Sequence, residues 1–167
     1  MREERQARLL EAMIEFDKGD PKRIQHFLKV WTFARQIGQM EGLDEGIQCT
    51  LETAAIVHDI GIHACEEKYG STSGSLQEKE GPPLAREMLT GLGYEPDRTE
   101  RVCWLVGHHH TYSGVETADH QILLEADFLV NSYEDEMEES AIRNFCGKVF
   151  RTKSGIRLLE LQYGIRM

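Results

Sequence analysis

The sequence of 167 residues predicts an all-α fold, and three observations lead to that prediction. Apolar residues recur at the three- to four-residue spacing of amphipathic helices, and the alternating pattern of strands is absent. Residues that suit helix starts and ends interrupt this pattern, such as Asp20-Pro21 at a start and Gly42 and Gly91 at ends. The length suits a single domain over 1–167, with a core at about 20–135.

The apolar spacing assigns helices to most of the chain. The expected helical ranges are 2–18, 20–42, 44–61, 80–91, 97–109 and 119–133. Pro82 and Pro83 would then lie in the first turn of their helix, where proline is tolerated. The more polar region from Glu138 to Met167 predicts a helical extension.

Between Ile62 and Glu78 the chain is polar, rich in Gly and Ser, and without helical spacing, so we expect a long loop there. Because it follows directly after His58-Asp59, one interpretation is a lid that orders over a bound phosphate. The alternative is an idle surface insertion, which loop-closure entropy tolerates at small cost.

Composition excludes several classes of protein. A net charge of −10 argues against a broad nucleic-acid-binding surface, which requires a basic patch. No apolar run is long enough to cross a bilayer, and no secretory signal is recognisable, so we expect a cytosolic protein without membrane contact. The four cysteines form no C-x-x-C pair and are expected to be reduced thiols; His63-Ala64-Cys65 lacks a second ligand pair for zinc.

Ionisable residues interrupt three apolar helical stretches. Asp127 lies inside one stretch, the pair His58-Asp59 ends another, and His26 is flanked by apolar residues in a third. A buried charge without a partner costs several kcal/mol, so each of these groups needs one. They could simply pair with one another, and His26 could also face solvent. Together, however, two imidazoles and two carboxylates are a suitable ligand set for a divalent transition metal in a helical bundle.

Three consecutive histidines, His108 to His110, lie where a helix is expected to end. Neighbouring residues are separated by about 100° around a helix, so the three cannot all face one way. One or two could point to the same site as His26 and Asp127. The alternative is a solvated helix terminus, where the helix dipole favours imidazolium.

An ordered set of these residues resembles the HD-domain superfamily of metal-dependent phosphohydrolases. The set is His26, His58-Asp59, His108-His109 and Asp127. Within the same span, 80–85 resembles the family's glycine-started helix and 124–131 resembles its final metal-binding helix. The resemblance covers roughly residues 20 to 135.

The resemblance implies an HD-domain-like helical bundle in which His26, His58, Asp59 and Asp127 ligate a metal. The implied cofactor is one divalent transition metal ion, either Fe, Mn, Ni, Co or Zn, with a second ion left open. Two-metal members add histidines near the position of Glu80, where this chain has only Glu78-Lys79-Glu80. The Gly-Tyr-Pro motif of cyclic-di-GMP phosphodiesterases is also missing, so that activity is not expected.

The implied activity is hydrolysis of a phosphate ester or anhydride, with a nucleotide or related phosphorylated metabolite as substrate. Asp59 is expected to orient a water molecule, and proton transfer is assigned to Glu80, His108 or His109. Residues in or beside the predicted loop are candidates to hold substrate phosphate, or else ordinary surface charges. They are Lys68, Lys79 and Arg86.

Two other classes of function remain open at this point. One is a non-catalytic, metal- or nucleotide-binding module with a regulatory role. The other is a helical interaction protein in which the His and Asp residues pair by coincidence. A homodimer also stays open.

Overall fold

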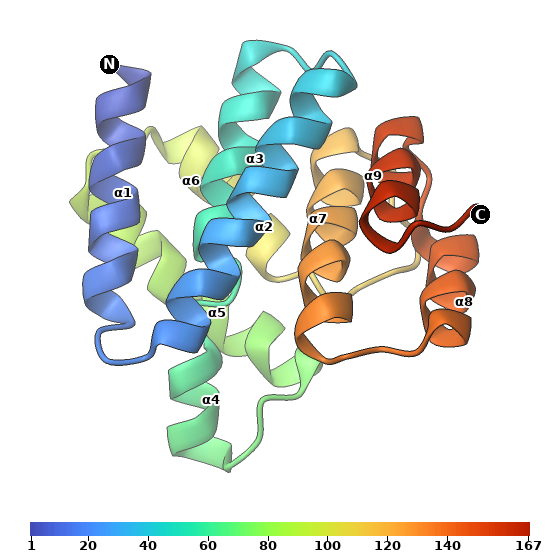
Figure 1. Ribbon diagram of the computed structural model, residues 1–167. Coiled ribbons are helices and arrows are strands. Elements are labelled where there is room, and N and C mark those ends of the chain that lie inside the picture. The colour runs from blue at the N-terminus through green and yellow to red at the C-terminus, as the bar shows by residue number, and fades with distance from the viewer.

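The computed structural model describes residues 1–167 and confirms the all-α prediction, with nine helices and no strand (Figure 1). The helices are α1 (Arg2–Phe16), α2 (Pro21–Met40), α3 (Glu45–Val57), α4 (Ile62–Tyr69), α5 (Gly74–Gly91), α6 (Pro96–Val106), α7 (Ala118–Glu134), α8 (Glu139–Val149) and α9 (Lys153–Tyr163). None of them combines the length and the apolar content that crossing a membrane requires.

Helices α2, α3 and α7 form the centre of the molecule, with α1, α5 and α6 on one side and α8 and α9 on the other (Figure 1). Helix α3 is the most deeply buried of the three, because every residue from Thr50 to Val57 is buried. Aspartate side chains fix where α2 and α3 begin. Asp20 accepts a hydrogen bond from the Arg23 backbone N–H at 3.2 Å, and Asp44 accepts one from that of Ile47 at 3.0 Å.

The expected long loop over Ile62–Glu78 is wrong. Most of this segment is helical, and only residues 70–73 connect α4 to α5. Ile62 and Cys65, three residues apart, bury one face of α4, and Gly70 ends that helix in the left-handed region at φ 60°. A flexible lid of the expected length is therefore not present.

Helix α5 begins six residues earlier than the predicted start at Glu80, so Pro82 and Pro83 are inside the helix rather than in its first turn. Gly81 precedes Pro82 and has no Cβ to clash with the proline ring, which lets the helix pass through this point. A Cβ at Gly81 would lie 2.7 Å from Val106 Cγ1, so α5 also approaches α6 closely here.

The turn that follows His58-Asp59 packs directly on α5. A Cβ at Gly61 would lie 2.8 Å from the Gly81 backbone nitrogen, a distance that real Cβ atoms do not reach. Glycine at both positions thus lets the two backbones touch. This contact sets the direction in which the chain leaves the His58-Asp59 pair.

Candidate metal centre

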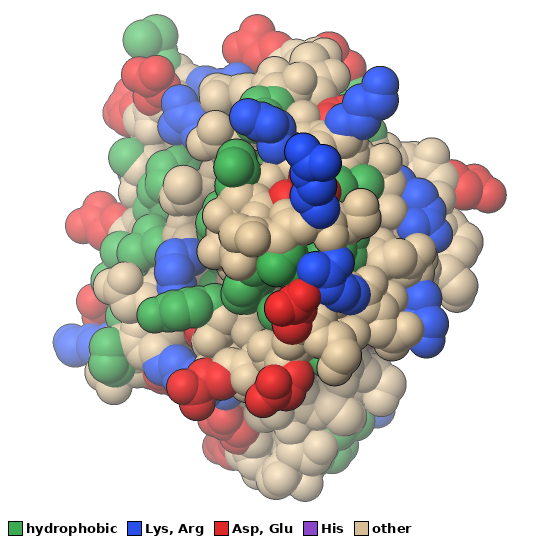
Figure 2. Space-filling view, turned by 45° about the vertical axis from the view of Figure 1, so that its right-hand side comes forward, with side chains coloured by type: hydrophobic (Ala, Val, Ile, Leu, Met, Phe, Trp, Pro, Cys, Tyr) green, Lys and Arg blue, Asp and Glu red, His purple; other side chains and the backbone are tan.

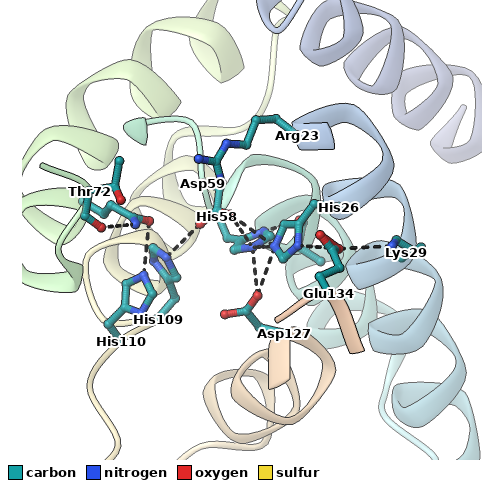
Figure 3. Close-up of polar contacts among 12 residues, drawn as sticks. Arg23, His26, Lys29, His58, Asp59, Thr72, His109, His110, Asp127 and Glu134 are labelled. Atoms are coloured by element: carbon teal, nitrogen blue, oxygen red, sulfur yellow. Dashed lines mark hydrogen bonds and ion pairs between the residues drawn. The ribbon is translucent and has the colours of Figure 1, made fainter. Parts of the chain in front are cut away.

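Four parts of the fold bring ionisable side chains to one place (Figure 3). His26 comes from the first half of α2, and Asp127 from the middle of α7. His58-Asp59 forms the turn after α3, and His109 lies in the turn after α6. The three histidines are at most 5% exposed, and no histidine is visible on the face shown in Figure 2.

The four residues predicted as ligands lie in mutual contact. The Nε2 atoms of His26 and His58 are 3.2 Å apart. His26 Nε2 lies 3.2 Å from both Asp59 Oδ2 and Asp127 Oδ1. His58 Nε2 lies 3.4 Å and 3.3 Å from the same two oxygens. Two nitrogens and two carboxylate oxygens therefore surround one small volume.

The other ring nitrogen of each histidine is already bound to an acceptor. His58 Nδ1 lies 2.7 Å from the Ala55 carbonyl oxygen, and His109 Nδ1 lies 2.7 Å from that of Val106. His26 Nδ1 lies 3.0 Å from Glu134 Oε1. Since carbonyl and carboxylate oxygens only accept, Nδ1 carries the hydrogen in each neutral ring, and the Nε2 lone pair faces the centre.

This arrangement fits a cation. Lone pairs on three Nε2 atoms face two carboxylates, and neither kind of group can donate a hydrogen bond to the other. Asp127 Oδ1 and His109 Nε2 are both buried without a hydrogen-bond partner, although charged or polar atoms surround them. A divalent ion satisfies both orphaned atoms at once, and His and Asp are an established donor set for such ions.

Without a metal ion, bound protons supply the positive charge that balances the two carboxylates. Burial lowers the pKa of His26, but its contacts with Asp127 and Asp59 outweigh burial and raise the pKa to about 11. Burial works against ionisation of Asp59, yet His58, His109 and His26 hold the pKa of this carboxyl well below its usual range. The metal-free centre therefore keeps a proton on His26.

A second group of donors shares Asp59 with the first. Asp59 Oδ1 lies 3.2 Å from His109 Nε2, so the two oxygens of this carboxylate face different histidines. His110 joins Asp59 and His109, with one donor atom of each residue within 4.8 Å of the others. Glu78 Oε1 holds this turn, because it accepts hydrogen bonds from the His110 backbone N–H at 3.0 Å and the Thr111 hydroxyl at 2.7 Å.

The other residues predicted for catalysis lie apart from this centre. Glu80 is bound to Lys68 Nζ at 2.6 Å and to the Tyr69 hydroxyl at 2.8 Å, and no hydrogen bond or ion pair joins it to the centre. His108 stacks on Trp104 with ring centroids 3.9 Å apart, and its Nδ1 lies 2.7 Å from the Trp104 carbonyl oxygen.

The residues predicted to bind substrate phosphate also have other partners. Lys68 is occupied by Glu80, and Lys79 Nζ lies 5.8 Å from the centroid of the Tyr69 ring. Arg86 makes a bidentate pair with Glu100, with both N···O distances at 2.8 Å. The structure does not bring these three cations together.

Sequence reasoning missed three residues beside the centre, namely Arg23, Glu78 and Glu134. Helical spacing could have found two of them. Glu134 lies seven residues after Asp127 on α7, and Arg23 three residues before His26 on α2, so each shares a helix face with a predicted ligand. Figure 3 draws Arg23 on α2 beside the centre, and its guanidinium lies 3.4 Å from Glu66 and 4.0 Å from Asp20. Nothing in the sequence separates Glu78 from Glu80.

Comparisons with known proteins agree with this geometry. The model of the HD domain family matches residues 23–142. A crystal structure titled as a predicted HD superfamily hydrolase, from an uncultured Thermotogales bacterium, is similar with a TM-score of 0.67 and 24% identity, over 95% of this chain and 84% of that chain. No curated protein matches the chain. Since the family model covers more than half of the sequence, the chain belongs to the HD domain family.

Proposed function

We propose that the protein is a metal-dependent phosphohydrolase and that His26, His58, Asp59 and Asp127 hold its metal ion. HD domains are generally metal-dependent hydrolases, and this chain belongs to that family. The observation that carries the proposal is the meeting of three imidazole Nε2 atoms and two carboxylates, a group that has no hydrogen-bond donor while the rings are neutral and therefore needs a cation, either a proton or a metal ion. A bound divalent ion would neutralise charge on a phosphoryl group and acidify water.

Side chains of the protein would orient the water molecule, transfer a proton and bind the substrate phosphate. Asp59 is the group best placed to orient a water molecule, because its two oxygens face different histidines and its side chain is 17% exposed. His109 contacts Asp59 and is the candidate for proton transfer that lies closest to the centre. Arg23, three residues before His26 on α2, is our candidate for binding the substrate phosphate, which would replace its contacts with Glu66 at 3.4 Å and Asp20 at 4.0 Å.

Asp59, His109 and His110 support a second ion beside the first. These residues form a separate group of donors that shares the Asp59 carboxylate with His26 and His58. A carboxylate between two ions is a common arrangement in two-metal hydrolytic sites. The histidine that this chain lacks near Glu80 would then be replaced by His110, which comes from the same turn as His109.

The proposed activity is tested by metal content and turnover together. The purified protein is stripped with chelator, reloaded separately with Mn, Fe, Co, Ni, Zn or Mg, and analysed for bound metal. Each form is assayed on p-nitrophenyl phosphate and a panel of nucleotides. We expect at least one ion per chain and metal-dependent phosphate release. Metal binding without turnover on any substrate would favour the non-catalytic binding module, and failure to bind any ion would refute the site.

Glu134→Gln is expected to weaken metal binding by roughly 10- to 100-fold while the helical fold is retained. Glu134 accepts a hydrogen bond from His26 Nδ1 at 3.0 Å and contacts Lys29 Nζ at 3.1 Å, so it fixes the ring and raises the basicity of Nε2. Competition with a chelator measures the affinity. The matched control is Asp135→Asn, an exposed acid one residue further along, and equal affinities in the two variants would contradict this role.

A further inference from the structure

A second cavity lies at the opposite end of α3 from the metal centre. Its volume is about 400 Å³, which is within the range of small-molecule sites. Its lining residues come from the start of α1, from α3 between Glu45 and Thr53, from the connection between α5 and α6, and from the first turn of α6. Among its lining residues are Arg2, Arg5, Gly46, Tyr94 and Arg98.

Three arginines line this cavity, in a protein with 29 acidic and 19 basic residues. Arg2 is neutralised, because its Nη2 lies 3.0 Å from the fully buried Glu52. Arg5 and Arg98 have no carboxylate within 4.0 Å, in contrast to Arg86 and Arg101, which form bidentate pairs. Two guanidinium groups therefore bring uncompensated positive charge to one cavity.

Arg5, Tyr94 and Arg98 line the same cavity from three different parts of the fold. The Tyr94 side chain is only 7% exposed, and the Arg5 guanidinium carbon lies 5.4 Å from its ring centroid. Burial raises the pKa of the Tyr94 hydroxyl, and a hydrogen bond with Thr53 acts against this rise. The cavity thus offers two guanidinium groups to a single ligand, with the Tyr94 ring beside Arg5.

The start of α3 forms another part of the lining, because Gly46 lies in its first turn. The Asp44 carboxylate accepts a hydrogen bond from the Ile47 backbone N–H at 3.0 Å, so the positive end of this helix is partly compensated and the arginines supply most of the positive charge. The one carboxylate in the lining is Glu45, whose side chain is 83% exposed and lies 3.9 Å from Arg2 Nη1. This carboxylate can turn to solvent without leaving a buried charge.

We propose that this cavity binds a phosphate group of a small molecule and that it is separate from the metal centre. Arginine guanidinium groups and helix N-termini both favour phosphate, whose several oxygens accept more hydrogen bonds than a carboxylate does. His58 follows Gly46 by twelve residues on one helix, a separation of roughly 18 Å. A ligand here contacts no residue of the metal centre, and α3 connects the two sites directly.

The test is calorimetric titration of the chelator-treated, metal-free protein with pyrophosphate, with acetate as the carboxylate comparison. Wild type is expected to bind pyrophosphate and not acetate. Arg5→Gln and Arg98→Gln are each expected to weaken binding about tenfold or more, as for loss of a hydrogen bond to a charged group. Arg8→Gln, an exposed arginine on α1 outside the cavity, is the matched control and should bind as wild type.

Asp127→Asn separates this proposal from the metal site, because it alters the metal centre and leaves the cavity unchanged. Pyrophosphate binding that persists in Asp127→Asn supports the cavity, even if no phosphatase activity is found. Circular dichroism and thermal melting of each variant without ligand confirm that it is folded. The proposal is overturned if wild type does not bind pyrophosphate at millimolar concentrations, or if folded Arg5→Gln and Arg98→Gln both bind as tightly as wild type.

Discussion

Asp59→Ala is expected to lower kcat/KM for phosphate-ester hydrolysis by about 10³-fold or more, the upper range for removing a group that stabilises transition-state charge. Asp59 is the one residue that faces all three histidines, with oxygens 3.2–3.4 Å from the Nε2 atoms of His26, His58 and His109. Its loss removes negative charge from both groups of donors. We therefore expect metal retention to fall with activity.

The helical fold should survive this substitution, because it depends on apolar burial rather than on Asp59. The core cluster contains 29 buried residues, which come from every helix except α4, and Asp59 is not among them. Far-ultraviolet circular dichroism checks that the helical fold is retained, and metal analysis checks that metal retention falls. The matched control is Glu67→Ala, an exposed acid on α4, which should keep wild-type activity. Full activity in the Asp59→Ala variant would show that Asp59 has no role in catalysis.

The clustering of His26, His58, Asp59 and Asp127 was predictable from sequence because these residues interrupt or end apolar stretches. His26, His58 and Asp127 lie at positions that helical spacing turns inward, and a buried ionisable group needs a partner. Their contacts follow once α2, α3 and α7 pack together. His109 is the member that sequence alone could not select, since three consecutive histidines differ only by rotation about the chain.

The helical structure of residues 62–78, which follow the His58-Asp59 pair, was not predictable in the same way. Helix α4 has only Ile62 and Cys65 buried, which is a weak periodic signal over eight residues. The start of α5 is supported by tertiary contacts: the Gln77 side chain donates to the Thr72 carbonyl oxygen at 2.7 Å, and Gly74 packs against the His110 side chain. Local composition carries no information about such contacts.

The missing information about tertiary contacts also explains why Glu80 rather than Glu78 was predicted to lie at the site. Glu78 and Glu80 are two residues apart on α5, so they differ by about 200° around the helix. The structure turns Glu78 to His110 and Thr111, and turns Glu80 to Lys68 on α4. Which of the two faces the site depends on the rotation of α5, and that rotation is set by its packing on Gly61 and Val106.

Asp127 should matter more for stability than Asp59, because it is 4% exposed and lies within a continuously buried part of α7. Burial alone would raise its pKa, but contacts with His26 and His58 hold the pKa of this carboxyl well below its usual range. A carboxyl whose folded pKa is lowered stabilises the fold above its unfolded pKa of about 3.8, and this stability is lost as pH falls below that value.

Asp127→Ala is therefore expected to destabilise the metal-free protein by about 3–5 kcal/mol near pH 7, the cost of removing one partner of a buried ion pair. The variant leaves His26 protonated or forces it to lose its proton, and either change costs free energy. Urea unfolding in chelator at pH 7 and pH 3 measures the effect. The difference between wild type and variant should shrink at pH 3, because wild type has by then lost part of its carboxylate contribution, and it should shrink further as pH falls towards the lowered folded pKa. Asp97→Ala, in the exposed first turn of α6, serves as the control and should stay within about 0.5 kcal/mol of wild type. A similarly small change for Asp127→Ala would show that this carboxylate does not compensate the buried histidines.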